Sequence, residues 1–211
     1  MTYAYDKHYL DDSMRTLGEA FDYAANDCGV SLDELYGMFV SSGIARQFEV
    51  GVPKYISGMS GTELAMEIFS RAGVKKSCGE LRVAYDASPE YWCGWILAYY
   101  QWFTSKSFKD IRKSVSMEEV LKMYPTLHEA HENKFVEILD KIIARQELPT
   151  KLSALRKNVG YSQKELAEKS GVTIRMIQQY EQRAKDINKA SVSNLIALSK
   201  TLGCRIEDLL E

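Results

Sequence analysis

Two histidines and a glutamate lie close together in the segment LHEAHE, and His128, His131 and Glu132 have side chains that bind transition metals. On a helix, histidines three residues apart share one face. Their spacing differs from the H-E-x-x-H pattern in which zinc proteases hold their ion. We therefore interpret these side chains as a solvated helix face and expect no bound metal.

The four cysteines are the next residues that could do chemistry. They form no C-x-x-C pair, so the sequence supports neither a zinc knuckle nor a dithiol redox motif. The N-terminal sequence MTYAYDKHYL lacks the apolar core of a signal peptide, and a reducing cytosol keeps thiols free. We expect a cytoplasmic protein with four free thiols, at Cys28, Cys78, Cys93 and Cys204.

No pattern of catalytic residues stands out elsewhere. The sequence has no glycine-rich phosphate loop after a strand pattern and no G-x-S-x-G motif. Its most apolar run, residues 91–103, is shorter than the roughly 20 residues that a membrane-spanning helix needs. We predict that the chain is no enzyme, binds no cofactor and does not enter a membrane.

The elements that position any functional residue are predicted to be helices. Apolar residues recur every three to four positions from Leu10 to Ala25, as in an amphipathic helix, and Ser88-Pro89 is typical of a helix start. Four serines are followed three residues later by glutamate, which predicts capping boxes at helix N-termini. These pairs are Ser31/Glu34, Ser60/Glu63, Ser116/Glu119 and Ser162/Glu165.

Residues 91–103 are apolar on nearly every side, which predicts a central helix. We expect its aromatic side chains to form core, with the wall of a ligand pocket as the alternative. A further helix is predicted over residues 127–146 and a loop over residues 51–61. Alternation at Leu81, Val83 and Tyr85 indicates a short strand or an extended connection.

A domain boundary is predicted near Pro149, which ends one helical pattern, and Thr150, which can cap the next helix. Residues 1–149 contain 16 Lys and Arg against 22 Asp and Glu, whereas residues 150–211 contain 11 against 7. We therefore predict an all-α protein with two domains. An acidic helical domain, residues 1–148, would be regulatory or bind a partner, and a basic domain would cover residues 150–211.

Residues 161–181, YSQKELAEKSGVTIRMIQQYE, contain two helical patterns of about two turns on either side of Gly171. Isolated helices this short are marginal in water, so other helices must hold them at a fixed angle. Glycine suits the turn because a positive φ costs it little. Thr173 can cap the second pattern, with Ile177 and Tyr180 facing the core.

Residues 152–210 resemble the helix-turn-helix domain of Cro and phage repressors, the XRE-type transcriptional regulators. The resemblance is carried by LRK (155–157), SQKELAEKSGVT (162–173), IQQYE (177–181), LIALSKTLG (195–203) and IEDLL (206–210). It implies a lambda-repressor-like bundle of five helices, in which the third helix enters the major groove of double-stranded DNA and the second braces it.

The resemblance also implies which side chains contact DNA. Base-reading positions are Thr173, Ile174, Arg175 and Gln179, with Gln178 as a further candidate; glutamine pairs with adenine, arginine with guanine, and isoleucine contacts a thymine methyl. Gln163 matches a position that binds a phosphate and supports the reading helix. Further phosphate candidates are Arg156, Lys157, Lys164, Arg183, Lys185 and Lys189.

The link after Glu181, EQRAKDINKASVS, is longer than the tight connection usual in this family. Because that link and the following helices commonly form the family's dimer interface, the dimer geometry does not transfer to this chain. We still expect a homodimer on an inverted repeat, with half-sites about 34 Å apart.

Two functions remain for the whole chain. It resembles bipartite antitoxins that autoregulate a toxin–antitoxin operon, in which case the acidic domain binds a toxin protein and the basic domain binds the operator. The alternative is a ligand-responsive repressor with a small-molecule pocket lined by the aromatic helix. Acidity favours the first function, whereas a polar cavity beside Trp95 and Tyr99 would favour the second.

Overall fold

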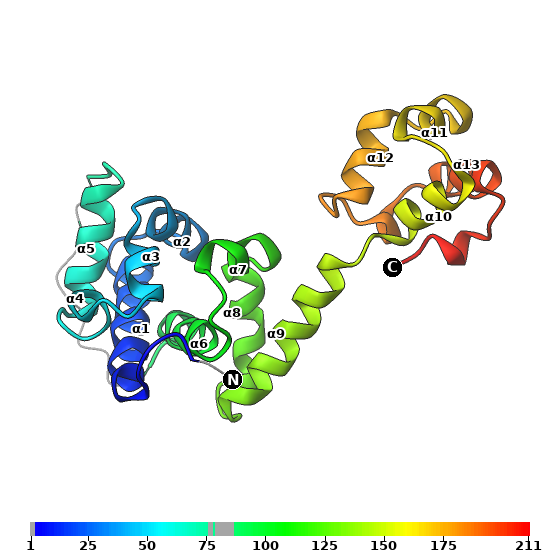
Figure 1. The fold of residues 1–211 in the computed structure, drawn as a ribbon. Helices are drawn as coiled ribbons and strands as arrows, with labels where there is room; N and C mark the ends of the chain where they lie inside the picture. Colours follow the sequence, from blue (N-terminus) through cyan, green and yellow to red (C-terminus); the bar gives the residue numbers. More distant parts are fainter. Residues whose placement is uncertain (1–2, 76–77, 79–86) are drawn as a thin grey trace. The chain divides into compact units, whose positions relative to one another are not determined.

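The computed structural model describes residues 3–75, Cys78 and residues 87–211 (Figure 1). These residues form two compact units, Met1–Ile143 and Ala144–Glu211, and the described parts of both contain helices and no strand. The all-α prediction is confirmed for the described residues. The alternating segment at Leu81, Val83 and Tyr85 lies outside them.

The first unit begins with a one-turn 3-10 helix and continues with α-helices, of which α2, α5, α6 and α8 start at serines predicted to begin helices. Each predicted capping box in this unit forms both of its hydrogen bonds. The elements are η1 (Lys7–Tyr9), α1 (Leu10–Asn26), α2 (Leu32–Ser41), α3 (Ile44–Glu49), α4 (Pro53–Ile56), α5 (Gly61–Arg71), α6 (Pro89–Thr104), α7 (Phe108–Ser114), α8 (Met117–Leu127) and α9 (Glu132–Glu147), whose residues after Ile143 belong to the second unit.

Helices α1 and α6 pack along each other, and α1 also packs against α2, α4 and α5 (Figure 1). The two backbones approach so closely that a side chain at Gly94 would place its Cβ 2.4 Å from the carbonyl oxygen of Leu17. Trp92, Tyr100 and Trp102 are buried as core, as expected. The helix also has a half-buried face, which carries Trp95, Tyr99 and Phe103.

Two boundary predictions are wrong. The helix expected over residues 127–146 begins five residues later than predicted, because α8 ends at Leu127 and α9 begins at Glu132. Between them the amide of Ala130 donates to Leu127 O, and the amide of Asn133 donates to the ring Nδ1 of His131 in the manner of a helix cap. The loop expected over residues 51–61 contains the single helical turn α4, which starts at a proline.

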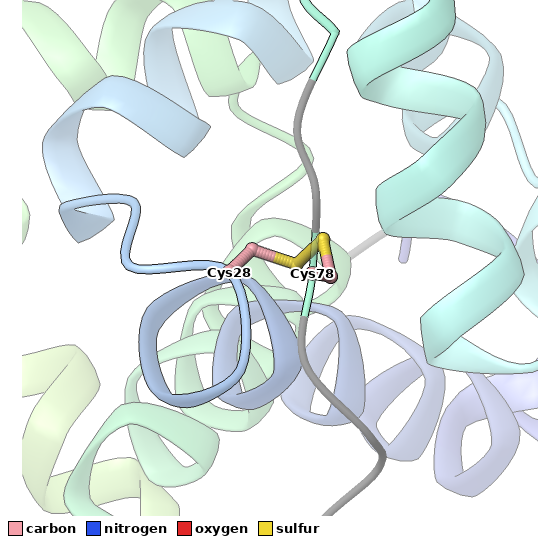
Figure 2. Close-up of a disulfide and its surroundings, with 2 residues drawn as sticks. All are labelled: Cys28 and Cys78. Atoms are coloured by element: carbon pink, nitrogen blue, oxygen red, sulfur yellow. A yellow bond between two sulfur atoms is a disulfide. The ribbon is translucent and has the colours of Figure 1, made fainter.

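A disulfide joins Cys28, just after α1, to Cys78 (Figure 2). The expectation of four free thiols is therefore wrong for this pair, whereas Cys93 and Cys204 are free. The two bonded residues are 50 positions apart, so no local spacing in the sequence predicts the bond. The cross-link closes a loop of chain that contains α2 to α5.

The second unit contains four short α-helices and two 3-10 turns. Its core consists mainly of leucine, isoleucine and valine side chains, with Tyr180 as its one fully buried aromatic residue. Left-handed glycines end three of the helices, as expected for helices that stop abruptly. The elements are α10 (Lys151–Val159), α11 (Gln163–Ser170), α12 (Ile174–Glu181), η2 (Ile187–Lys189), α13 (Val192–Leu202) and η3 (Ile206–Asp208).

Candidate nucleic-acid interface

The turn between α11 and α12 is three residues long and is fixed at both ends. Gly171 has φ of +74° and its amide donates to Ala167 O, which closes α11. Thr173 then caps α12 by accepting a hydrogen bond from the amide of Met176 at 3.4 Å. Val172 between them is buried, so the turn itself is part of the core. Two helices of two turns each are thereby held at one angle.

Helix α12 has two distinct faces. Ile177 and Tyr180 are almost fully buried, as predicted. On the other face Thr173 and Arg175 are exposed, Gln178 and Gln179 are half-buried, and Ile174 keeps 42% of its surface exposed. An isoleucine exposed among hydrogen-bonding side chains has no partner in the domain core. This face thus offers both polar and methyl groups to whatever contacts it.

The C-terminal end of α12 is tied to the two preceding helices through Glu181. Its carboxylate accepts two hydrogen bonds from Arg156 of α10, Nε to Oε1 at 2.6 Å and Nη2 to Oε2 at 2.9 Å. The amide Nε2 of Gln163, at the start of α11, donates to the same carboxylate at 2.8 Å. Gln163 therefore contacts the last residue of α12 directly, as its predicted supporting role requires.

The guanidinium of Arg156 is buried, since only 10% of its side chain is exposed, and its Nη1 donates to Tyr161 O at 2.6 Å. The expectation of a phosphate contact from Arg156 is therefore wrong, because this side chain is used inside the bundle. Burial raises the pKa of Glu181, but the hydrogen bonds from Arg156 and Gln163 outweigh burial and lower it below the ordinary value. Glu181 is thus an anion that holds three helices together.

The C-terminal unit matches a known protein family. Residues 152–209 match the family model described as helix-turn-helix. The C-terminal unit is a helix-turn-helix domain. The resemblance to XRE-type regulators is confirmed, and the chain carries the DNA-binding module of a transcription regulator. Searches of curated proteins and of solved structures give no match.

The lysines and arginines predicted to contact DNA phosphates have different surroundings within the helix-turn-helix domain. Lys164 and Lys185 are exposed; the first lies 3.9 Å from Glu168, and the second lies 3.8 Å from the sulfur of Met176. Arg183 instead has a positive φ of 54° and donates to Leu148 O at 2.9 Å, with Glu211 at 3.4 Å. Arg183 therefore helps to order the long link after α12.

Sequence reasoning missed Glu181 as the residue that anchors α12. The signal was present, because an acid closes the IQQYE motif while a base lies in the LRK motif. Their spacing of 25 residues, however, does not place them together without the fold.

The candidate metal ligands do not come together in the described part of the chain. His128 lies at the end of α8 and donates from Nδ1 to Tyr124 O at 2.9 Å, whereas His131 caps α9. No group of three potential metal ligands occurs among the described residues. None of the described helices is both long enough and apolar enough to cross a membrane.

Proposed function

We propose that the helix-turn-helix domain binds a specific operator by placing α12 in the major groove. One observation supports this: α12 has a buried face, which Ile177 and Tyr180 hold in the core, and an opposite face that is exposed. Its outer face then reads bases through Thr173, Ile174, Arg175 and Gln179, with Gln178 as an additional contact. Gln163, Lys164, Arg183 and Lys185 orient the domain on the phosphates.

The operator is an inverted repeat bound by a homodimer in the cytoplasm, in this proposal. A single bundle of this size contacts few base pairs, so two copies on half-sites about 34 Å apart supply the affinity. Residues 150–211 form the DNA-binding domain and residues 1–148 the regulatory domain. The charge difference supports this division, because only the C-terminal part is basic.

We further propose that the acidic domain binds a protein partner and that the chain is an antitoxin that represses its own operon. The excess of six acidic residues over residues 1–149 supports a basic partner, since opposite charges speed encounter and select the partner. A small toxin gene beside the gene for this chain is expected. Co-purification of that gene product with residues 1–148, and its loss in 0.5–1 M salt, tests the partner.

A second function, a ligand-responsive repressor, is supported by one observation. A hollow of about 370 Å³ lies beside α6, and Trp95 and Tyr99 are among its lining residues. Its size lies within the range of small-molecule sites. In this reading a ligand bound to the first unit changes the affinity of the dimer for DNA.

The experiment that tests operator binding is selection of bound fragments from the source genome, followed by footprinting. We expect one symmetric site upstream of the chain's own gene. Gln179→Ala is expected to relax discrimination at one base pair by about 1–3 kcal/mol. Lys164→Ala should weaken binding to all sequences alike and reduce the salt dependence. If both variants weakened every sequence equally, α12 would not read bases.

A further inference from the structure

The hollow beside α6 is built by three parts of the first unit that are distant in sequence. The N-terminal segment and α1 supply Tyr3, Lys7 and Asp11, α6 supplies its half-buried aromatic face, and the start of α9 supplies His131 and Glu132. None of these groups has a role in the DNA-binding domain.

One wall of the hollow consists of packed aromatic rings. Tyr99 and Phe103 stack with their centroids 5.8 Å apart, and Tyr3 stacks on Trp102 at 4.0 Å with the ring planes 5° apart. Trp95 also lines the hollow and is only half-buried. Aromatic ring faces carry a negative quadrupole, so this wall favours both a flat ring and a positive charge.

Hydrogen bonds hold the wall in place. The hydroxyl of Tyr99 donates to Asn133 Oδ1 at 2.9 Å. The backbone N–H of Asn133 donates to Nδ1 of the His131 ring at 3.2 Å. The indole Nε1 of Trp102 donates to Tyr5 O at 2.9 Å, which ties the N-terminal segment to α6. Burial raises the pKa of Tyr99, so its hydroxyl keeps its proton at neutral pH. A wall ordered in this way loses little entropy when a ligand binds.

The charged groups that line the hollow favour a cation. Asp11 and Glu132 are acidic, Lys7 is the one lysine or arginine in the lining, and His131 is the one histidine. Within the described part of the chain, Asp11 forms no ion pair, and Glu132 Oε2 lies 3.4 Å from Nδ1 of His131. Asp11 is therefore available to a ligand, a cation near Glu132 would share its carboxylate with His131, and the two carboxylates outnumber the lysine.

We propose that this hollow binds a small planar organic cation, such as an aromatic amidine or a protonated heterocycle. The ring stacks on the aromatic wall, and the cationic group lies near Asp11 and Glu132. The proposal deepens the ligand-responsive function and rests on it for its biological meaning, but binding is measured without DNA. The two ideas therefore fail separately.

Benzamidine is the probe, because it joins a flat ring to a planar cation. Binding to the full chain is followed by the NMR signal of the Trp95 indole N–H, assigned by comparison with Trp95→Phe. We expect a dissociation constant of about 1 mM, since a ligand of this size has few atoms to contribute. Neutral benzamide should bind about fivefold more weakly, because it loses the attraction to the rings and carboxylates. Equal binding of benzamide, or tighter binding of benzoate, would overturn the proposal.

Charge variants test the roles of the individual groups. Glu132→Gln should weaken benzamidine binding about threefold, whereas Lys7→Gln should strengthen it about twofold because a repulsive charge is removed. Glu118→Gln is the matched control, since Glu118 is also an acid in the first turn of its helix but lies outside this hollow. A loss of affinity in the control equal to that of Glu132→Gln would contradict a local site.

An arginine side chain of a protein partner presents the same planar cation, so N-acetyl-arginine amide is the second probe. We expect it to bind more weakly than benzamidine because it has no ring to stack. If it bound at least about threefold more tightly, the hollow would be a docking site for a protein and the small-molecule assignment would be wrong. Benzamidine binding without any change in operator affinity would remove the ligand-responsive function but not the binding site.

Discussion

The two units of this chain reach a fixed structure by different physical means. The first unit surrounds α6 with apolar and aromatic side chains and adds a cross-link between Cys28 and Cys78. The helix-turn-helix domain has a much smaller core and fixes α12 through one buried ion pair. Small domains bury proportionally less surface, so single polar contacts carry a larger share of their stability. The comparison suggests that the DNA-binding domain is the more sensitive of the two to single substitutions.

The largest effect is expected from Arg156→Met. The substitution leaves the carboxylate of Glu181 buried without its charged partner, which costs about 3–5 kcal/mol of unfolding free energy. All three tryptophans belong to the first unit, so their fluorescence reports on that unit alone. Hydrogen exchange followed by mass spectrometry should show loss of protection in α10 to α12 while the tryptophan signal is unchanged.

The control for this prediction removes both charges. Arg156→Met combined with Glu181→Met should cost less than Arg156→Met alone, because two apolar side chains can replace a buried ion pair. If the double variant were the less stable of the two, the pair would contribute more than the relief of an unpaired charge. A cost below about 1 kcal/mol for the single variant would show that the bundle does not depend on this contact.

The next largest effect is expected on the first unit, from loss of the disulfide. Cys28→Ser should lower its unfolding free energy by about 2–4 kcal/mol, because the unfolded chain regains the freedom of a loop of 50 residues. Chemical denaturation followed by tryptophan fluorescence measures this change. A reductant should lower the unfolding free energy of the wild type by the same amount. The same loss is expected in a reducing cytosol, where disulfides are uncommon. Cys204→Ser in the other unit is the control and should leave the transition unchanged.

Local signals in the sequence predicted the helices that begin at capping boxes, and the family resemblance predicted the helix-turn-helix fold. Serine and glutamate three residues apart predicted all four capping boxes, because both bonds of such a box lie within one turn. The pairing of Cys28 with Cys78, and of Arg156 with Glu181, depends on how distant helices pack. A cavity beside Trp95 and Tyr99 was an alternative from the sequence, but its closure by His131 was not predicted, since the helix expected over residues 127–146 has no turn at that residue.

A smaller effect is expected from Gln163→Ala, which sharpens the distinction between support and base reading. Loss of its hydrogen bond to Glu181 should cost about 1 kcal/mol of domain stability. The less firmly held α12 should lower affinity about fivefold for every operator sequence alike. Lys164→Ala, at the adjacent exposed position, should leave stability unchanged. Sequence-selective loss of affinity in Gln163→Ala would contradict a supporting role.

The smallest effect is a difference in the response of the two units to acid. The pKa of Glu181 is lowered in the folded domain, so its contribution to stability is full above about pH 4.3, the value of an unfolded glutamate, and is lost as pH falls through the folded pKa. In the first unit, burial raises the pKa of Glu49, although the amide of Phe108 donates to its carboxylate. Its contribution is therefore full below about pH 4.3 and is lost as pH rises through the folded pKa.

Substitution by glutamine removes each titration and isolates its sign. Glu181→Gln should reduce the loss of protection in the helix-turn-helix domain between about pH 5 and pH 3. Glu49→Gln should instead make the tryptophan-monitored stability of the first unit less dependent on pH between about pH 4 and pH 6, and should raise it near neutral pH. Hydrogen exchange and fluorescence over this range measure the two responses in the same sample. Responses of the same sign would show that burial of Glu49 does not disfavour its charge, because only a disfavoured carboxylate gains stability from protonation.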